Sequence, residues 1–295
     1  MSAATSKFSK ERSKFYPMYF YLPIGLIYGL LFVVPTFTSF YYSMTRWSLF
    51  GVDFIWFENF FMFFQDPFLI NGLVHTFIYA FLTSGLKVAI GMVLGVILTS
   101  NIAFQSFLRN VVFFPVLVST IGIGLTFQSL MKPETGVINE ALNFFGLPDV
   151  YWLTDPGIAL YSVIAVDVWK GVGLATVIYI AGIASIPTEY SEAAKIDGAG
   201  VWHNFRHITL PLLRPATNTV IILSLIGGLR SFDLIWAMTQ GGPGFASDVV
   251  ASVIYKNYQA GFYGLSTAGN VVLFILIAIL ILPLSRFLSK REIES

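Results

Sequence analysis

The side chains with the most chemical potential gather in one polar stretch, EYSEAAKIDGAGVWHNFRHITLPLLRP, which runs from Glu189 to Pro215. His203 and His207 stand four positions apart, a spacing at which two imidazoles on one helix face can bind zinc. A zinc protease would carry a glutamate directly after the first histidine, but Asn204 occupies that position and no further ligand is evident. A metal site is therefore the weakest interpretation. An amphipathic segment on a membrane surface and a docking segment for a soluble partner are favoured about equally.

A second group of reactive side chains lies inside otherwise apolar segments. It consists of five charged residues: Lys87, Asp167, Lys170, Arg230 and Asp233. Charges within a membrane cost free energy, so such residues usually pair with one another or line a functional path. The last four form two pairs of opposite sign, each three residues apart and so on one helix face. The spacing predicts mutual neutralisation within each pair, with contact to a translocated solute as the alternative.

The composition indicates which kind of structure must position these residues. Of the 295 residues, 56% are hydrophobic and only 11% are charged, and the mean hydropathy is +0.75. Soluble proteins carry roughly a quarter charged residues, so an integral membrane protein is predicted. A net charge of +1 without any basic run argues against nucleic acid as a partner. The absence of cysteine excludes disulfides, thiolate metal sites and a cysteine nucleophile.

Apolar segments of about 20 residues can cross a hydrocarbon core of about 30 Å as helices. The sequence contains six such segments, which predict an all-α, polytopic membrane protein with six transmembrane helices. The predicted spans are Phe15 to Tyr41, Leu73 to Thr99, Val111 to Leu130, Ile158 to Ile183, Thr217 to Met238 and Leu265 to Leu288. The first is too long for the apolar region of a signal peptide, and no small-residue cleavage site follows it, so we expect it to remain in the protein.

Lysine and arginine in the connecting loops predict the orientation, because cytoplasmic loops carry the excess of positive charge. If the N-terminus is cytoplasmic, eleven of these residues lie on the cytoplasmic side and three lie outside. Both termini are therefore predicted to be cytoplasmic, with tails 1–14 and 289–295 flanking a six-span domain at 15–288. Residues 187–215, called here the polar loop, then form the second cytoplasmic connection, between spans four and five.

The polar loop is predicted to begin with a short helix that ends in a sharp turn. Thr188 can cap the helix, and Glu189 then faces the positive end of the helix dipole. Gly198 is a typical C-terminal stop, and Ala193 and Ala194 give the helix a small face. A helix of about ten residues is not stable alone in water. We therefore expect it to be held by tertiary contacts.

The same loop carries a resemblance to a known family. Seven positions match, in order and spacing, the EAA signature of permease subunits in binding-protein-dependent ATP-binding-cassette importers. They are Glu192, Ala193, Ala194, Gly198, Ile208, Leu210 and Pro211. Two further stretches, GVINEAL before span four and FDLIWAMTQGGPG from Phe232 to Gly244, resemble the carbohydrate branch of that family, which includes maltose and glycerol-3-phosphate uptake systems.

The resemblance implies a function and a set of partners. In such importers the loop forms a coupling helix that seats in a cleft of an ATPase subunit, so Glu192 is expected to meet a basic side chain there. Two ATPase subunits, a second related permease subunit, an extracytoplasmic solute-binding protein and membrane lipid are the expected partners, in the prokaryotic cytoplasmic (inner) membrane. The chain lacks a phosphate-binding G-x-x-x-x-G-K-[ST] motif. We therefore expect a permease without enzymatic activity, cofactor or metal, with ATP hydrolysis on separate chains.

The resemblance also implies which residues line the solute path. Alignment with the family's sugar contacts on spans four and five points to Asp167, Gly171, Ser224, Gly228 and Ser231. The last three form a stripe of small residues, which more often marks close helix packing than a ligand site. The expected solute is a sugar or oligosaccharide. The alternatives are a polyol or glycerol phosphate importer and a membrane scaffold that recruits a soluble partner.

Overall fold

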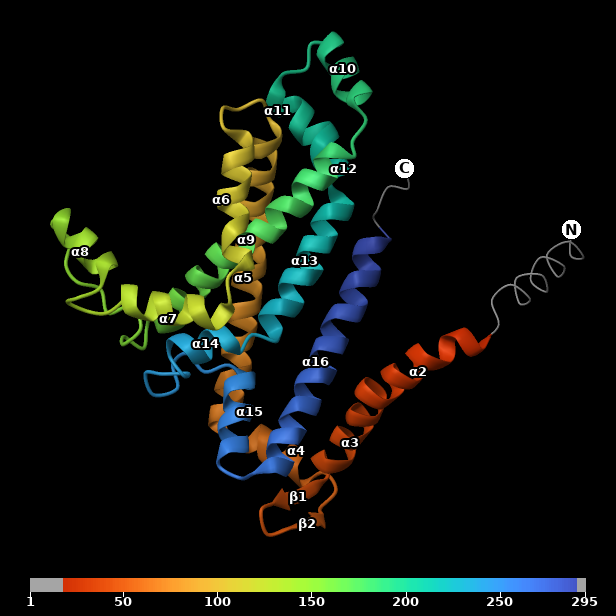
Figure 1. The fold of residues 1–295 in the computed structure, drawn as a ribbon, viewed down its shortest axis with the longest axis vertical. Coiled ribbons are helices and arrows are strands. Elements are labelled where there is room, and N and C mark those ends of the chain that lie inside the picture. Colours follow the sequence, from red (N-terminus) through yellow and green to blue (C-terminus); the bar gives the residue numbers. More distant parts are fainter. Residues whose placement is uncertain (1–17, 291–295) are drawn as a thin grey trace, which may run out of the picture.

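Long helices running in one general direction make up most of the structure (Figure 1). It is a computed structural model that describes residues 18–290. Its central bundle contains α5 (Pro67–Thr99), α9 (Ala159–Ala184), α13 (Arg214–Leu229) and α16 (Tyr263–Ser289). α5 packs along both α9 and α13, and α16 packs on α13. Four described helices are long and apolar enough to cross a membrane, and two bent helix pairs raise the possible number to six, so the predicted all-α polytopic fold is confirmed.

Predicted spans two, four and six correspond to α5, α9 and α16. The fourth and sixth agree with the structure to within two residues at each end. α5 starts earlier than predicted, at Pro67 rather than Leu73. Asp66 caps this helix, because its carboxylate accepts a hydrogen bond of 2.8 Å from the Phe68 amide. Proline has no amide N–H, and amides in the first turn of a helix have no acceptor within that helix. Pro67 can therefore start the helix directly after Asp66 without loss of a hydrogen bond.

Spans three and five were each predicted as one continuous helix, and the structure shows two helices in each. Span three consists of α6 (Gln105–Leu117) and α7 (Thr120–Leu130), which meet at an angle of 99°. α13 ends at Leu229, and a separate short helix, α14 (Asp233–Met238), follows. The 13 residues of α6 rise only about 20 Å. α7 and α14 instead pack against each other, where the Gln128 side-chain amide donates to the Met238 carbonyl at 3.3 Å.

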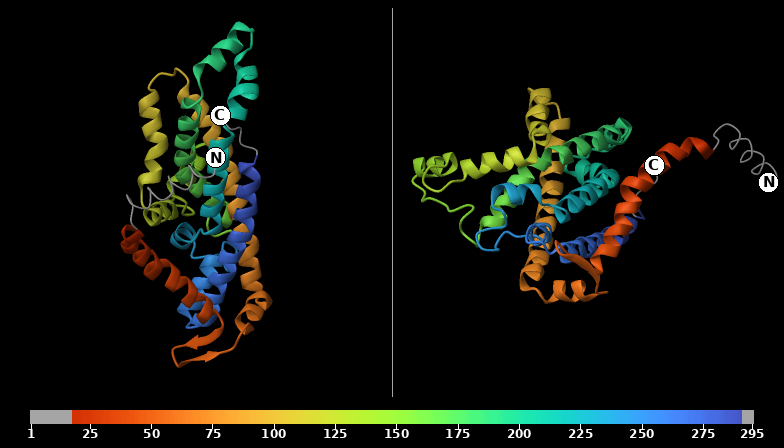
Figure 2. Two further views of the ribbon diagram at one scale, coloured as in Figure 1. Left: turned by 90° about the vertical axis from the view of Figure 1, so that its right-hand side faces the viewer. Right: turned by 60° about the horizontal axis from the view of Figure 1, so that its bottom comes forward.

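The first predicted span diverges from the bundle (Figures 1 and 2). It comprises the 3₁₀ turn η1 (Met18–Tyr21), α2 (Leu22–Tyr28), the π-helical turn η2 (Gly29–Val33) and α3 (Val34–Ser43). No residue in its most apolar part is buried against the rest of the described chain. The predicted start of this span at Phe15, the tail 1–14 and residues 291–295 of the other tail lie outside the described residues.

A short hairpin follows α3 at the end of the molecule opposite the polar loop (Figure 1). β1 (Thr45–Ser48) and β2 (Gly51–Phe54) pair antiparallel, with Thr45 opposite Phe54 and Ser48 opposite Gly51. α4 (Glu58–Gln65) anchors the hairpin, because the buried Asn59 amide donates to the carbonyls of Ser43 and Thr45, both at 2.8 Å. The sequence predicted no strand in this region.

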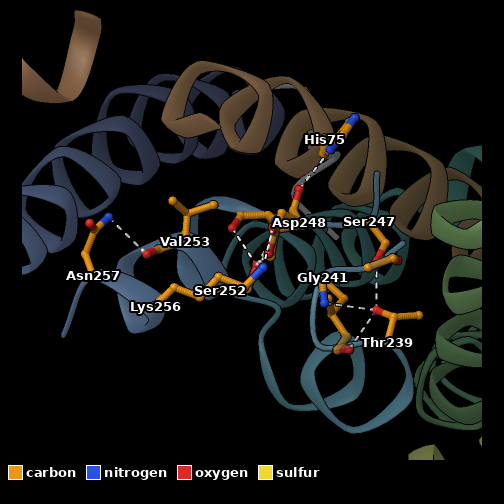
Figure 3. Close-up of polar contacts among 12 residues, drawn as sticks. His75, Thr239, Gly241, Ser247, Asp248, Ser252, Val253, Lys256 and Asn257 are labelled. Atoms are coloured by element: carbon orange, nitrogen blue, oxygen red, sulfur yellow. Dashed lines mark hydrogen bonds and ion pairs between the residues drawn. The ribbon is translucent and has the colours of Figure 1, made fainter. Parts of the chain in front are cut away.

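Outside the polar loop, two further helices complete the described fold. α8 (Val137–Phe144) projects sideways as an arm (Figure 1), and its Asn139 accepts from the Trp152 indole N–H at 2.9 Å. α15 (Val250–Gln259) follows the glycine-rich turn after α14. In that turn, the Asp248 carboxylate accepts hydrogen bonds from Ser252 and Lys256, each at 2.6 Å (Figure 3). The His75 ring donates to the Asp248 carbonyl at 2.9 Å, which ties the turn to α5.

Candidate functional site

The polar loop stands beyond the end of the bundle (Figure 1). It is built from α10 (Thr188–Ile196), α11 (Val201–Asn204), the π-helical turn η3 (Phe205–Thr209) and α12 (Leu210–Leu212). None of these elements contains a buried residue. The predicted capping role of Thr188 is wrong, because Pro187 holds the cap position and no side chain caps the helix. Thr188 thus lies inside the first turn.

The predicted stop at Gly198 is confirmed by the backbone geometry. Gly198 has a φ of +78°, in the left-handed region that L side chains disfavour. Its amide donates to the Lys195 carbonyl at 3.1 Å, and the Ala199 amide donates to the Ala194 carbonyl at 2.8 Å. These two bonds form a Schellman motif, which satisfies carbonyls at the end of α10 and reverses the chain. The reversal brings α11 and η3 back beside α10.

A groove of about 530 Å³ lies between α10 and the returning chain. Four of the seven signature residues line it, together with both histidines of the loop. They are Ala193, Ala194, Gly198, Ile208, His203 and His207. The Asn204 side-chain amide donates to the Ser191 hydroxyl at 3.3 Å and so joins the two walls. The rings of the two histidines stack with centroids 4.1 Å apart, and the described chain holds no group of three possible metal ligands.

The three remaining signature residues do not line this groove. Glu192 is exposed on α10. Leu210 and Pro211 lie in α12, where the chain bends by 64° into α13. Leu213, directly before α13, is fully buried and fixes this bend to the bundle. The polar loop is therefore continuous with α13 through this bend.

The structure adds exposed apolar residues that the sequence analysis did not select as site residues. Ile196, Val201 and Trp202 are 87%, 90% and 70% exposed at the tip of the polar loop. Large apolar side chains in such a position usually mark contact with another molecule. The signal available in the sequence was that large apolar side chains stand within an otherwise polar loop.

A buried ion pair joins two helices of the bundle. The Lys87 ammonium on α5 lies 2.6 Å from the Asp167 carboxylate on α9, and their side chains are 11% and 21% exposed. The predicted pairs Asp167–Lys170 and Arg230–Asp233 are wrong, because neither occurs among the ion pairs of the described residues. Lys87 reaches Asp167 across Gly171, where an added Cβ would lie 2.6 Å from the Lys87 Cε. The pairing therefore depends on a glycine of the neighbouring helix.

This ion pair borders a cavity of about 200 Å³ between α5, α9 and α13, called here the charged cavity. Three of the five predicted path residues line it: Asp167, Gly171 and Ser224. Lys170, for which contact with the solute was the alternative prediction, also lines it, as does Gly227, which was not predicted.

The other two predicted path residues lie elsewhere. Gly228 is buried against α5, since an added Cβ would be 2.6 Å from the Ala80 Cα. Ser231 lies beside the buried Tyr79. The Tyr79 hydroxyl is close to Asp167 as well, but has no hydrogen-bond partner by geometry. The small-residue stripe thus divides into a cavity-facing part at Ser224 and a packing part at Gly228.

An apolar helical bundle, a largely exposed polar loop at one end and a charged cavity between helices together define a polytopic protein of the transporter permease class. Residues 87–293 match the family described as "Binding-protein-dependent transport system inner membrane component". This match covers more than half of the chain, so the chain belongs to that family. It is a permease subunit of the ATP-binding-cassette importer type, and its place is the inner membrane.

Several relatives share this assignment along nearly their whole length. The chain is 32% identical to "Probable ABC transporter permease protein YurN" of Bacillus subtilis (strain 168), over 96% of this chain and 99% of the relative. It is 30% identical to "Trehalose/maltose transport system permease protein MalF" of Thermococcus litoralis, over 90% and 92%. A solved bacterial ABC transporter "involved in the import of the acidic polysaccharide alginate" contains a chain with a TM-score of 0.84 at 23% identity, over 96% and 99% of the two chains. That likeness confirms the fold.

Proposed function

We propose that this chain is a permease subunit of an ATP-driven importer that translocates a sugar or oligosaccharide delivered by an extracytoplasmic binding protein. The names of relatives support a carbohydrate, since they include a trehalose/maltose permease and a probable permease for starch degradation products. A solved structure of similar fold holds an alginate pentasaccharide-bound periplasmic protein. The observation that carries the proposal is the complete EAA signature displayed on an exposed loop.

In this proposal, an ATPase on a separate chain seats in the groove of the polar loop. Ala193 and Ala194 have small side chains, so a partner can approach α10 closely. Glu192 offers a carboxylate for a basic residue of the ATPase, and Ile196 and Trp202 add apolar contact area. The bend at Leu210 and Pro211 passes ATPase movement to α13 and hence to the wall of the charged cavity.

The solute path in this proposal includes the charged cavity. Asp167, Ser224 and Lys170 provide polar groups at its wall, while Gly171 and Gly227 leave room for a sugar ring. Each hydrogen bond that replaces water contributes roughly 0.5–1.5 kcal/mol net. The path role proposed for Gly228 and Ser231 is indirect, since Gly228 packs α13 against α5 and Ser231 lies beside the buried Tyr79.

The assembly that we propose contains two ATPase subunits, this chain and a second related permease subunit. In this proposal the second permease completes the path, of which α5, α6, α9 and α13 of this chain supply the part at the charged cavity. The proposed topology places both termini and the polar loop in the cytoplasm. The hairpin of β1 and β2 lies at the opposite end from the polar loop, as this topology requires (Figure 1).

Reconstitution of the assembly in proteoliposomes tests the proposal. The expected result is ATP hydrolysis that rises when a sugar-loaded binding protein is added, together with uptake of labelled oligosaccharide. Uptake of labelled glycerol phosphate or a polyol without sugar uptake would replace the carbohydrate assignment. Recovery of this chain with a soluble partner that neither hydrolyses ATP nor supports uptake would favour the scaffold alternative.

A further inference from the structure

The charged cavity contains one positive charge in excess. Three charged residues line it: Lys87, Asp167 and Lys170. Lys87 and Asp167 neutralise each other at 2.6 Å. Lys170 forms no ion pair with any residue that the structure describes. Its ammonium therefore remains as a free cation at the cavity wall.

No other charged side chain of the described chain reaches this cavity. Arg230 lies at the end of α13, in a different hollow beside α16, and Asp233 begins α14. The rest of the wall includes the apolar side chains of Val116, Leu174 and Leu223. The lining is thus largely apolar, and a charge beside apolar groups interacts more strongly than it would in bulk solvent.

We propose that this excess charge selects an acidic sugar, one that bears a carboxylate, as the solute of the proposed importer. Lys170 donates charge-assisted hydrogen bonds to the solute carboxylate, and Ser224 hydrogen-bonds a ring hydroxyl beside it. The Lys87–Asp167 pair stays intact and presents no net charge to the solute. This inference rests on the proposed carbohydrate function and adds the class of sugar to it.

The physical reason for the selectivity is the mismatch that a neutral sugar would leave. A lysine ammonium beside apolar groups loses part of its hydration. A neutral hydroxyl compensates for the lost water contacts only in part, because it brings no opposite charge. A carboxylate supplies both the opposite charge and hydrogen-bond acceptors, and such bonds are roughly twice as strong as neutral ones. A carboxylated sugar should therefore bind more tightly than the same sugar with its charge removed.

Two probes of nearly equal shape test this inference: digalacturonate and its dimethyl ester. Calorimetric titration would measure their binding to the purified complex of both permeases and the ATPases. We expect the acid to bind the wild-type complex at least about tenfold more tightly than the ester. Lys170→Met should abolish the difference, while Lys170→Arg should keep it. Lys132→Met removes a lysine from an exposed site outside the cavity and should keep the wild-type preference.

Equal affinities for the acid and the ester, or an acid preference that survives in Lys170→Met, would overturn the inference. Failure of the acid to bind would overturn it as well. Uptake of maltotriose, a neutral sugar, separates this failure from a failure of the proposed function. If maltotriose enters with ATP hydrolysis while digalacturonate does not bind, the carbohydrate importer stands and the acidic solute is wrong. If no sugar of either kind binds or enters, both are wrong.

Discussion

The polar loop and the charged cavity place their functional residues in opposite environments. The loop keeps its functional residues in water, and α10 has no buried residue at all. The cavity keeps its charges inside the bundle, where the Lys87 side chain is only 11% exposed. The loop is formed by one continuous segment, whereas the cavity combines residues from α5, α6, α9 and α13. A docking surface can thus be encoded by local spacing, but a path through a membrane is encoded by contacts between distant segments.

The first way to test this contrast is to break the buried ion pair. Asp167→Ala leaves the Lys87 ammonium without its partner inside the bundle, which should lower stability by roughly 3–5 kcal/mol. Thermal unfolding of the purified complex in detergent would measure the loss. The double variant Lys87→Met with Asp167→Leu removes both charges and should recover most of the stability. Equal stability of the single variant and the wild type would show that the pair is not structural.

Adjacent glycines on α13 provide a matched pair for the second test. Gly228→Leu places a side chain against the Ala80 backbone, and such overpacking should cost roughly 1–3 kcal/mol and reduce recovery of the complex. Gly227→Leu meets no atom within 4 Å and projects into the charged cavity. It should leave recovery unchanged and lower solute uptake. Gel filtration measures recovery of the complex, and an uptake assay measures transport. Normal recovery of Gly228→Leu together with loss of the Gly227→Leu complex would contradict the packing role of Gly228.

A third test concerns the turn of the polar loop. Gly198→Val forces a β-branched residue into the left-handed region, at a cost of roughly 1–2 kcal/mol, and should displace α11 from α10. Co-purification with the ATPase should fall as a result. Gly198→Asn is the control, because asparagine adopts the left-handed region more readily than a β-branched residue. Loss of ATPase binding in both variants would point to a general dependence on side-chain size.

The smallest effect on transport is expected from single-cysteine variants that report the orientation of the chain in the membrane. Single cysteines at Phe50 and Gly51 should leave transport unchanged, because Phe50 is 99% exposed and a Cβ added at Gly51 meets no other atom within 4 Å. A membrane-impermeant thiol reagent should label both in intact cells. A cysteine at Glu189 should react only after the membrane is permeabilised. Labelling in the opposite pattern would invert the proposed orientation.

Local chemistry explains which parts the sequence could predict. The stop at Gly198 depends on residues within five positions of it, and the prediction was confirmed. The long and predominantly apolar helices α9 and α16 were also predicted with nearly correct ends, because length and hydropathy alone specify a membrane helix. The cap was wrong at Thr188 because Pro187 takes the cap position one residue earlier.

The features that the sequence did not predict depend on contacts between distant parts of the chain. Lys87 is 80 residues from Asp167, and only the close approach of α5 and α9 at Gly171 makes them partners. Hydropathy averaged over 20 residues hides the bend at Ser119, where the hydroxyl accepts from the Gly122 amide and starts a new helix. Gly228 could not be told from Gly227 by the sequence, because the side of α13 that faces α5 is fixed by packing.

The measurement that tests the central claim most directly compares ATP hydrolysis with solute uptake in the same proteoliposomes. Glu192→Lys reverses a charge on the exposed loop, and Gly227→Leu narrows the charged cavity. We expect Glu192→Lys to lose both the stimulation of ATP hydrolysis by the loaded binding protein and the uptake of solute. Gly227→Leu should lose uptake and retain the stimulation. If Glu192→Lys keeps both activities at wild-type levels, the polar loop is not the site at which ATP hydrolysis is coupled to transport.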